Sequence, residues 1–204
     1  SPGQRRIVDN GWVWQPVGVI HTWRVDDWLT TNVFESEDGP SKKELGWGTM
    51  WDLPLCWLDD DTVAIWGYGQ EQDPIDAVRI MDAATGTRVR WFAGPAGDLV
   101  FDRVLIALGT TGTTVWNVER SARLLADSGP SPTRYHPTAK TFVRFDGSTI
   151  YRSRLHGLDA SFCSGAIADL ADRIAKEHAF DDLPVLGDAL EAAGCADREM
   201  LDHC

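Results

Sequence analysis

Hydrophobic and polar residues alternate in short runs over the first 156 residues. The runs are rich in β-branched and aromatic residues and are bounded by Gly, Pro, Asp or Asn, which is the pattern of β-strands joined by tight turns. They predict strands at Arg6–Asp9, Val17–Trp23, Leu53–Leu58, Thr62–Tyr68, Ala77–Met81, Arg88–Phe92, Asp98–Phe101, Val104–Leu108, Thr113–Val118, Ala122–Leu125, Thr133–His136, Thr141–Phe145 and Thr149–Ser153. Asn10-Gly11 and Asp146-Gly147 are predicted hairpin turns, because such pairs accept the backbone angles of two-residue turns.

One run recurs along the chain. Val78–Asp82 reappears in altered form at two later places and, more weakly, at an earlier one: Thr113–Asn117, Ser148–Arg152 and Ile20–Arg24. The strong copies are 35 residues apart. A period of this length with several strands per unit indicates stacked sheets or a propeller.

The polar, Gly-rich stretch Thr30–Trp51 interrupts the repeat. The spacing from Trp23 in the weak copy to Met81 in the next copy is 23 residues longer than the repeat. The stretch Thr30–Trp51 accounts for nearly all of this extra length. We predict an irregular insertion, and connections of this length in compact domains are often functional.

The pattern becomes helical from Ala160. Apolar residues at helical spacing between Ile167 and Ile174 predict an amphipathic helix. Pro184 near a helix start and Gly194 near its end predict a second helix, followed by a third short one up to Cys204.

Charge supports a division into two parts. Of the formal net charge of −12, residues 157–204 carry −8. We therefore predict a β-sheet repeat domain over 1–156 and an acidic α-helical segment over 157–204. The negative field repels phosphates and anionic lipid surfaces, so neither nucleic acid nor a membrane is expected as a partner.

The cysteines and the apolar runs indicate a cytoplasmic protein. The four cysteines show no Cys-x-x-Cys pair and no disulfide framework, which is typical of reduced thiols. We find no signal-peptide pattern and no apolar run of membrane-spanning length. The chain begins with Ser1, which a processed end or a fragment of a longer protein would explain.

Several motifs in the first 156 residues carry a family resemblance. Ser1-Pro2 is similar to the turn that precedes a strand in many propeller blades, and Asp82–Gly86 matches the Asp-x-x-Thr-Gly hairpin between outer blade strands. Aromatic-plus-polar strand ends, such as Trp116-Asn117, agree with this. These residues resemble bacterial WD40-like β-propeller repeats, although the Gly-His and Trp-Asp dipeptides are absent. The resemblance implies a mainly β fold of three to four blades, followed by a small α-helical C-terminal segment.

The number of repeats predicts an open or incomplete propeller. Residues 1–156 hold three repeats and part of a fourth, whereas propellers usually need at least four blades to close. An unclosed sheet exposes strand edges. Upstream blades outside this chain, a covering element, or an oligomer or partner that pairs with the edges would each resolve this.

A second resemblance concerns the C-terminal residues. The run Leu183–Cys195 followed by Leu201–Cys204 resembles a short helical element at the C-termini of some multidomain bacterial proteins. No catalytic role comes with that resemblance.

The insertion holds the candidate binding residues. Glu35, Glu37 and Asp38 are predicted to form an acidic loop that docks a protein, the alternative being a solvated loop. Trp47 and Trp51 are the tryptophans expected to be exposed, whereas the others are expected in the core.

Other groups support weaker hypotheses. Asp59–Asp61 could bind Ca²⁺, but a solvated hairpin turn accounts for it better. His136 could serve in acid–base catalysis, but no Asp or Ser stands with it in a recognisable motif. We therefore assign no catalytic residue, no metal site and no cofactor.

We expect a non-enzymatic protein-interaction scaffold in which a rigid β domain displays the insertion. Its partners would be other proteins or further parts of a longer regulatory chain. The alternative is a propeller-type enzyme or carbohydrate-binding protein that uses Trp47, Trp51 and the acidic loop residues. Clustering of these tryptophans with carboxylates around one cavity would favour the alternative.

Overall fold

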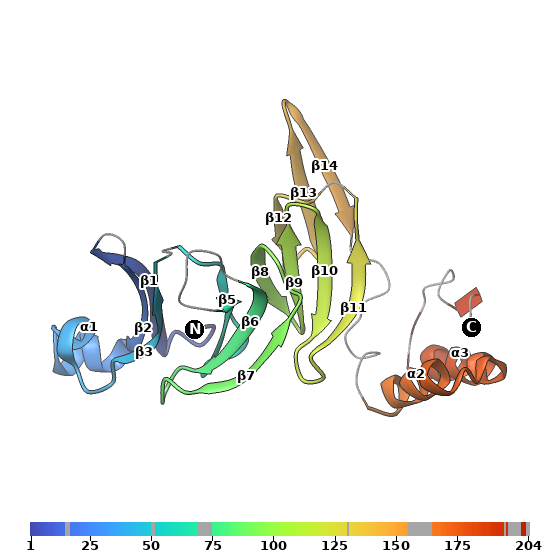
Figure 1. Ribbon diagram of the computed structural model, residues 1–204, viewed down its shortest axis with the longest axis horizontal. Coiled ribbons are helices and arrows are strands. Elements are labelled where there is room, and N and C mark those ends of the chain that lie inside the picture. The colour runs from blue at the N-terminus through green and yellow to red at the C-terminus, as the bar shows by residue number, and fades with distance from the viewer. Residues whose placement is uncertain are drawn as a thin grey trace. The chain divides into compact units, whose positions relative to one another are not determined.

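The computed structural model describes residues 1–14, 17–49, 52–68, 75–129, 131–154, 165–193, 195 and 201–202 (Figure 1). The chain forms two compact units, Ser1–Arg134 and Tyr135–Cys204. Four antiparallel sheets and a helical C-terminal segment confirm the predicted mainly β fold with propeller-like blades. The domain boundary predicted after residue 156 stays a prediction.

Each sheet is a meander, in which strands adjacent in sequence pair with one another. Sheet A contains β1 (Arg6–Trp14), β2 (Val17–Arg24) and β3 (Lys43–Gly48). Sheet B contains β4 (Leu55–Trp57), β5 (Thr62–Tyr68), β6 (Ile75–Asp82) and β7 (Arg88–Ala93). Sheet C contains β8 (Asp98–Asp102), β9 (Val104–Gly109), β10 (Gly112–Asn117) and β11 (Ala122–Asp127). Sheet D contains β12 (Arg134–His136), β13 (Thr141–Asp146) and β14 (Thr149–Arg154).

The repeated run occupies an equivalent strand in each sheet. It forms β2, β6, β10 and β14, and each of these pairs with the preceding strand. The predicted hairpins from Leu55 to Asp127 are confirmed, since local turn signals and alternating side chains agree there.

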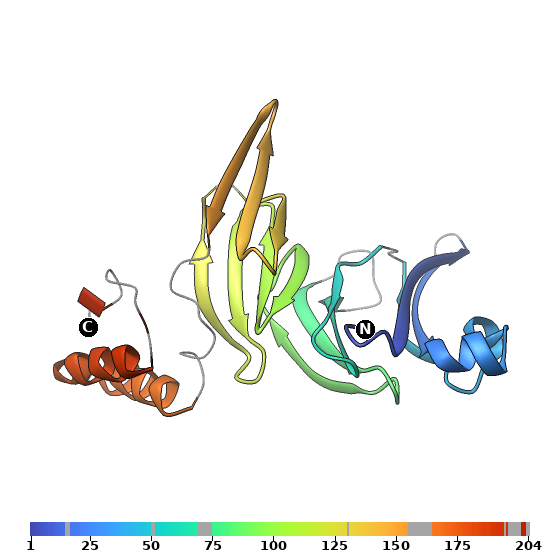
Figure 2. The ribbon, with the colours of Figure 1, turned by 180° about the vertical axis from the view of Figure 1, so that it is seen from behind.

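The sheets of the first unit stack face to face, A beside B and B beside C (Figures 1 and 2). Successive side chains of β5 point to opposite faces of sheet B, so alternate residues pack against sheet A and against sheet C. Val63 and Ile65 pack with Ile20 and Leu45 of sheet A. Ala64 belongs to the cluster shared with sheet C, in which the rings of Phe92 and Trp116 lie 5.6 Å apart. Burial of both faces makes sheet B the centre of this unit.

Two acidic hairpin turns are stabilised by their own carboxylates. Asp59 Oδ1 accepts hydrogen bonds from the backbone N–H groups of Asp61 and Thr62, at 2.8 and 2.7 Å. Asp82 Oδ1 accepts from Ala84 and Thr85, both at 2.8 Å. The bond from the Thr85 backbone is the main cause that lowers the pKa of Asp82. The solvated-turn interpretation of Asp59–Asp61 thus has a structural basis.

The turn predicted at Asn10-Gly11 is wrong. Both residues lie inside β1, where they pair with Ile20 and Val19 of β2. The Asn10 amide donates to the Leu53 carbonyl at 2.6 Å. A long-range hydrogen bond and continued strand pairing outweigh the local turn preference of this dipeptide.

The insertion predicted as irregular over Thr30–Trp51 is largely regular. It contains part of a π-helix, η1 (Asp27–Thr31), the helix α1 (Glu35–Asp38) and strand β3. Leu45 is 2% exposed in the core between sheets A and B. Burial of this side chain, with a bulge opposite Ile20 and His21, fixes the third strand.

The C-terminal helices are α2 (Gly165–Glu177) and α3 (Leu183–Ala192), joined through the 3₁₀ turn η3 (Phe180–Asp182). The amphipathic pattern is confirmed, because Ile174 and Leu190 are buried. Leu201 and Asp202 are helical, and Gly194 lies outside the described residues. None of the helices in the described part of the chain is both long and apolar enough to span a membrane.

Candidate functional site

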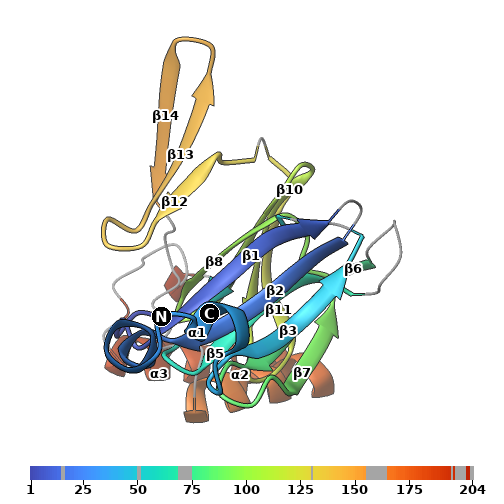
Figure 3. The same ribbon diagram turned by 90° about the vertical axis from the view of Figure 1, so that its left-hand side faces the viewer.

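Residues 26–42 form a structured projection on sheet A, which we call the docking segment. It contains η1 and α1 and lies where β2 ends and β3 begins (Figure 3). Trp28 of η1 packs edge-on against Trp23 of β2, with ring centroids 6.2 Å apart. The Trp28 indole N–H also donates to the Val33 carbonyl at 3.2 Å. One aromatic side chain therefore attaches the segment to the sheet and binds η1 to the connection that leads into α1.

The carboxylate of Glu35 holds the segment together from within. This side chain is buried, with 1% exposure, although it belongs to a four-residue surface helix. It accepts hydrogen bonds from the Ser41 backbone N–H at 2.7 Å, from the Ser41 hydroxyl, and from the Asn32 amide at 3.2 Å. The Ser41 hydroxyl oxygen accepts from the Arg24 N–H at 3.0 Å, so the network continues into β2. A side chain at Gly39 would overlap the carboxylate.

Loss of the Glu35 carboxylate should loosen the segment. The Ser41 hydroxyl bond is the main cause that lowers the pKa of Glu35 from its ordinary value of 4.5. Because the folded-state pKa is the lower one, the carboxylate stabilises the fold fully above the ordinary, unfolded-state pKa, and this contribution is lost as the pH falls through the folded-state pKa. We expect Glu35→Ala to speed amide hydrogen exchange in the segment by about tenfold or more at pH 7.

The matched control is Glu37→Ala, on the exposed side of the same helix. In this variant the amides of the segment should stay protected, as measured by hydrogen exchange with mass spectrometry. Equal loosening by the two substitutions would show that the buried network is not what holds the segment.

Three large apolar side chains of the segment face solvent. Leu29 is 68% exposed, Val33 71% and Phe34 59%. The Phe34 N–H donates to the Asn32 side-chain oxygen at 3.0 Å, so the backbone that carries the ring is held in place. Clusters of exposed apolar residues on a soluble fold mark interaction surfaces more often than chance.

The surroundings of these side chains are acidic. Residues 26–42 contain five carboxylates and one lysine. Glu37 and Asp38 are exposed on α1, whereas Asp27 pairs with Arg24 at 3.6 Å. The segment therefore carries exposed apolar side chains together with a net negative charge.

The predicted site residues fall into different environments. Glu35 is buried, Glu37 and Asp38 are exposed, and Trp47 on β3 is 48% exposed. Trp51 lies outside the described residues, and the expectation that Trp12 lies in the core is wrong, since it is 60% exposed. The sequence interpretation missed the exposed apolar side chains, and the only signal for them was the presence of large apolar residues in an otherwise polar stretch.

Trp47 lies on the face of sheet A opposite the core, where it is in register with Val19. The neighbouring row contains Asp9, His21 and Glu44, one from each strand. Partial burial and then Lys42 lower the pKa of His21, against the opposing effects of Glu44 and Asp9. The row is polar, and the Glu35 carboxylate bonds instead to Ser41 and Asn32 within the docking segment.

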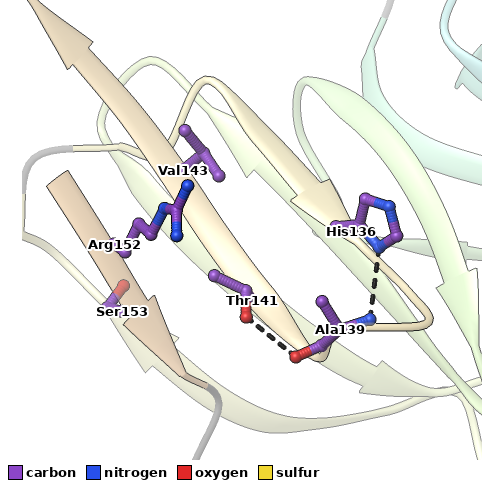
Figure 4. Close-up of a pocket in the computed structure, with 6 residues that line it drawn as sticks. All are labelled: His136, Ala139, Thr141, Val143, Arg152 and Ser153. Carbon is purple, nitrogen blue, oxygen red and sulfur yellow. Dashed lines mark hydrogen bonds between the residues drawn. The ribbon is translucent and has the colours of Figure 1, made fainter. Parts of the chain in front are cut away.

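Sheet D carries a cavity of about 500 Å³ (Figure 4). Its lining comes from β12, the turn after it, β13 and β14: His136, Ala139, Thr141, Val143, Arg152 and Ser153. His136 Nδ1 accepts a hydrogen bond from the Ala139 N–H at 3.2 Å, which occupies this nitrogen and orients the ring.

Comparisons with known proteins give similarity in structure only. No family model matches the chain, and no curated protein sequence gives a significant match. The WD40 β-propeller domain of Doa1 is similar with a TM-score of 0.46 and 11% identity, over 74% of this chain and 47% of that one. A chain of the mitotic checkpoint complex gives a TM-score of 0.39 and 15% identity, over 66% and 48%. This chain thus spans about half the length of those structures.

Proposed function

We propose that this protein is a non-enzymatic scaffold for protein interactions and that the docking segment is its main binding surface. The observation that carries the proposal is the exposure of Leu29, Val33 and Phe34 on a backbone fixed by the buried Glu35. A surface ordered before binding loses less conformational entropy when a partner arrives. Apolar side chains supply the contact area, and the exposed carboxylates of Glu37 and Asp38 favour a partner with basic residues.

A basic amphipathic peptide tests this proposal directly. An eighteen-residue peptide of leucine and lysine at helical spacing, titrated calorimetrically, should bind the wild-type chain. Replacing Glu37 and Asp38 together by Lys should weaken its binding by about tenfold or more, since two attractions become repulsions. The matched control replaces Asp188 and Glu191 of α3 by Lys, and should change the affinity little.

The apolar contribution has its own control. Phe34 and Phe180 are both 59% exposed, in different parts of the chain. Phe34→Ser should weaken peptide binding, whereas Phe180→Ser should not. If the two phenylalanine variants, or the two lysine double variants, behaved alike, the peptide would be responding to the overall charge of −12 and the proposed surface would be rejected.

A role in carbohydrate binding or catalysis has less support. Trp47 is exposed, but Glu35 is committed to internal hydrogen bonds. The cavity on sheet D is lined neither by Trp47 nor by the acidic residues of the docking segment. The cytoplasmic location expected from the sequence fits the free thiols of Cys56 and Cys195 and remains part of the proposal.

A further inference from the structure

In the part of the chain that the structure describes, sheet D has one strand fewer than sheets B and C. In sheets B and C the repeated strands β6 and β10 pair with the preceding strand along one edge and with the following strand, β7 or β11, along the other. The equivalent strand β14 is the last strand of its sheet and, within the described residues, pairs only with β13. Among the described residues no strand covers its outer edge, and the backbone N–H and C=O groups of such an edge can bind an added strand.

One face of sheet D combines apolar and cationic groups. Phe145 pairs across the strands with Ile150, and Val143 pairs with Arg152, so that all four side chains share one face. Phe145 and Ile150 are 55% and 57% exposed. Arg152 lies two residues further along β14 and reaches over the cavity toward Val143 (Figure 4).

The positive charge of this face comes from Arg152, which has no ion-pair partner among the described residues. Arg144, on the opposite face, pairs with Asp146 at 3.6 Å and lies 4.2 Å from the centre of the Tyr151 ring. The Arg152 side chain forms neither an ion pair nor a hydrogen bond with any residue that the structure describes, and none of the described residues that line the cavity is a carboxylate. Since His136 Nδ1 accepts a hydrogen bond, the neutral ring carries its proton on Nε2 as a further donor. In a chain of net charge −12, such a local excess of donors favours a carboxylate ligand.

We propose that β14 binds an extended peptide of a partner protein as a fourth strand of sheet D, with a peptide carboxylate opposite Arg152 and an apolar side chain opposite Ile150. The added strand would run antiparallel to β14, as β7 and β11 run to β6 and β10. Because Ile150 precedes Arg152, an antiparallel partner meets Arg152 first. The recognised pattern is therefore an acidic residue, any residue, then an apolar residue, in the N-to-C direction.

A second copy of β14 fits this edge poorly. An antiparallel pair centred on Tyr151 would set Arg152 against Ile150 of the other copy. Neither strand contains an Asp or Glu that could form an ion pair with the Arg152 guanidinium. A carboxylate-bearing segment of a different protein therefore matches the edge better than self-association does.

The test uses a fluorescein-labelled, amidated nonapeptide with Glu at its fourth position, Ile at its sixth and Thr elsewhere. Fluorescence anisotropy with the full chain should show saturable binding at protein concentrations up to about 1 mM. Arg152→Glu should weaken binding by about tenfold or more, because an attraction becomes a repulsion. The matched control, Arg123→Glu, makes the same charge change on the exposed edge strand β11 and should leave the affinity unchanged.

Two further measurements test the geometry. A peptide with the Glu and Ile positions exchanged should bind about tenfold more weakly, because its carboxylate then lies opposite Ile150. Amide hydrogen exchange over 149–154 should slow when the first peptide binds. The proposal is overturned by equal effects of the two arginine variants, by equal affinity for the two peptides, or by unprotected β14 amides. Peptide-sensitive dimerisation of the chain in sedimentation would instead assign the edge to a second copy.

Discussion

Replacing Ile65 with Ala is expected to lower the free energy of unfolding by about 2–5 kcal/mol, as large-to-small substitutions in cores do. Ile65 is fully buried in β5. Its side chain lies in the cluster that joins sheets A and B, with Ile20 and Leu45 across the interface. The substitution removes apolar contacts and leaves a cavity between stacked sheets, which can close only if a whole sheet moves.

The control is Ile75→Ala, in the neighbouring strand β6. Ile75 is 61% exposed, so its truncation should change the unfolding free energy by no more than about 0.5 kcal/mol. Urea denaturation followed by tryptophan fluorescence measures both variants. Similar losses at the two positions would mean that sheets A and B do not share a packed core. The result also bears on function, since sheet A carries the docking segment.

Gly97→Ala is expected to cost about 2–5 kcal/mol, because backbone strain and overpacking act together there. Gly97 has a φ of +95° in the turn before β8. A Cβ at this position would overlap the Leu108 carbonyl and lie 2.6 Å from the Gly109 Cα. Both of these are backbone atoms of β9, so relief requires a shift of the strand itself.

Gly147 separates the two causes. It also has a positive φ, +58°, but no atom lies within 4 Å of the position that a Cβ would take there. Gly147→Ala should therefore cost only the backbone term, about 1–2 kcal/mol. Thermal unfolding of both variants gives the comparison, and an equally large loss at Gly147 would remove the steric explanation for Gly97.

The repeated strands were accessible from sequence because their signals are local. Alternation of side chains identified β5 and β6, and the Asp82 turn followed from a short motif that binds its own backbone. The apolar residues at helical spacing up to Ile174 likewise identify the helix α2 and the face that it buries. Such features depend on residues only a few positions apart, so one chain suffices to identify them.

The tertiary structure decided the rest. Asn10-Gly11 is a typical turn dipeptide but lies in β1, because its residues pair with β2 and the Asn10 amide donates a hydrogen bond to the distant Leu53 carbonyl. Glu35 looked like a surface acid and is buried, since Ser41 and Asn32 surround its carboxylate.

Two surface properties also depended on the tertiary structure. The sequence could not show that Leu29, Val33 and Phe34 are exposed, nor that Arg152 lies over a cavity whose described lining residues include no carboxylate. Exposure and charge compensation depend on which distant residues come close. The sequence by itself determined most of the strands, their repeat and the helical C-terminal segment, whereas long-range packing determined β3, the full length of β1 and which side chains remain available to a partner.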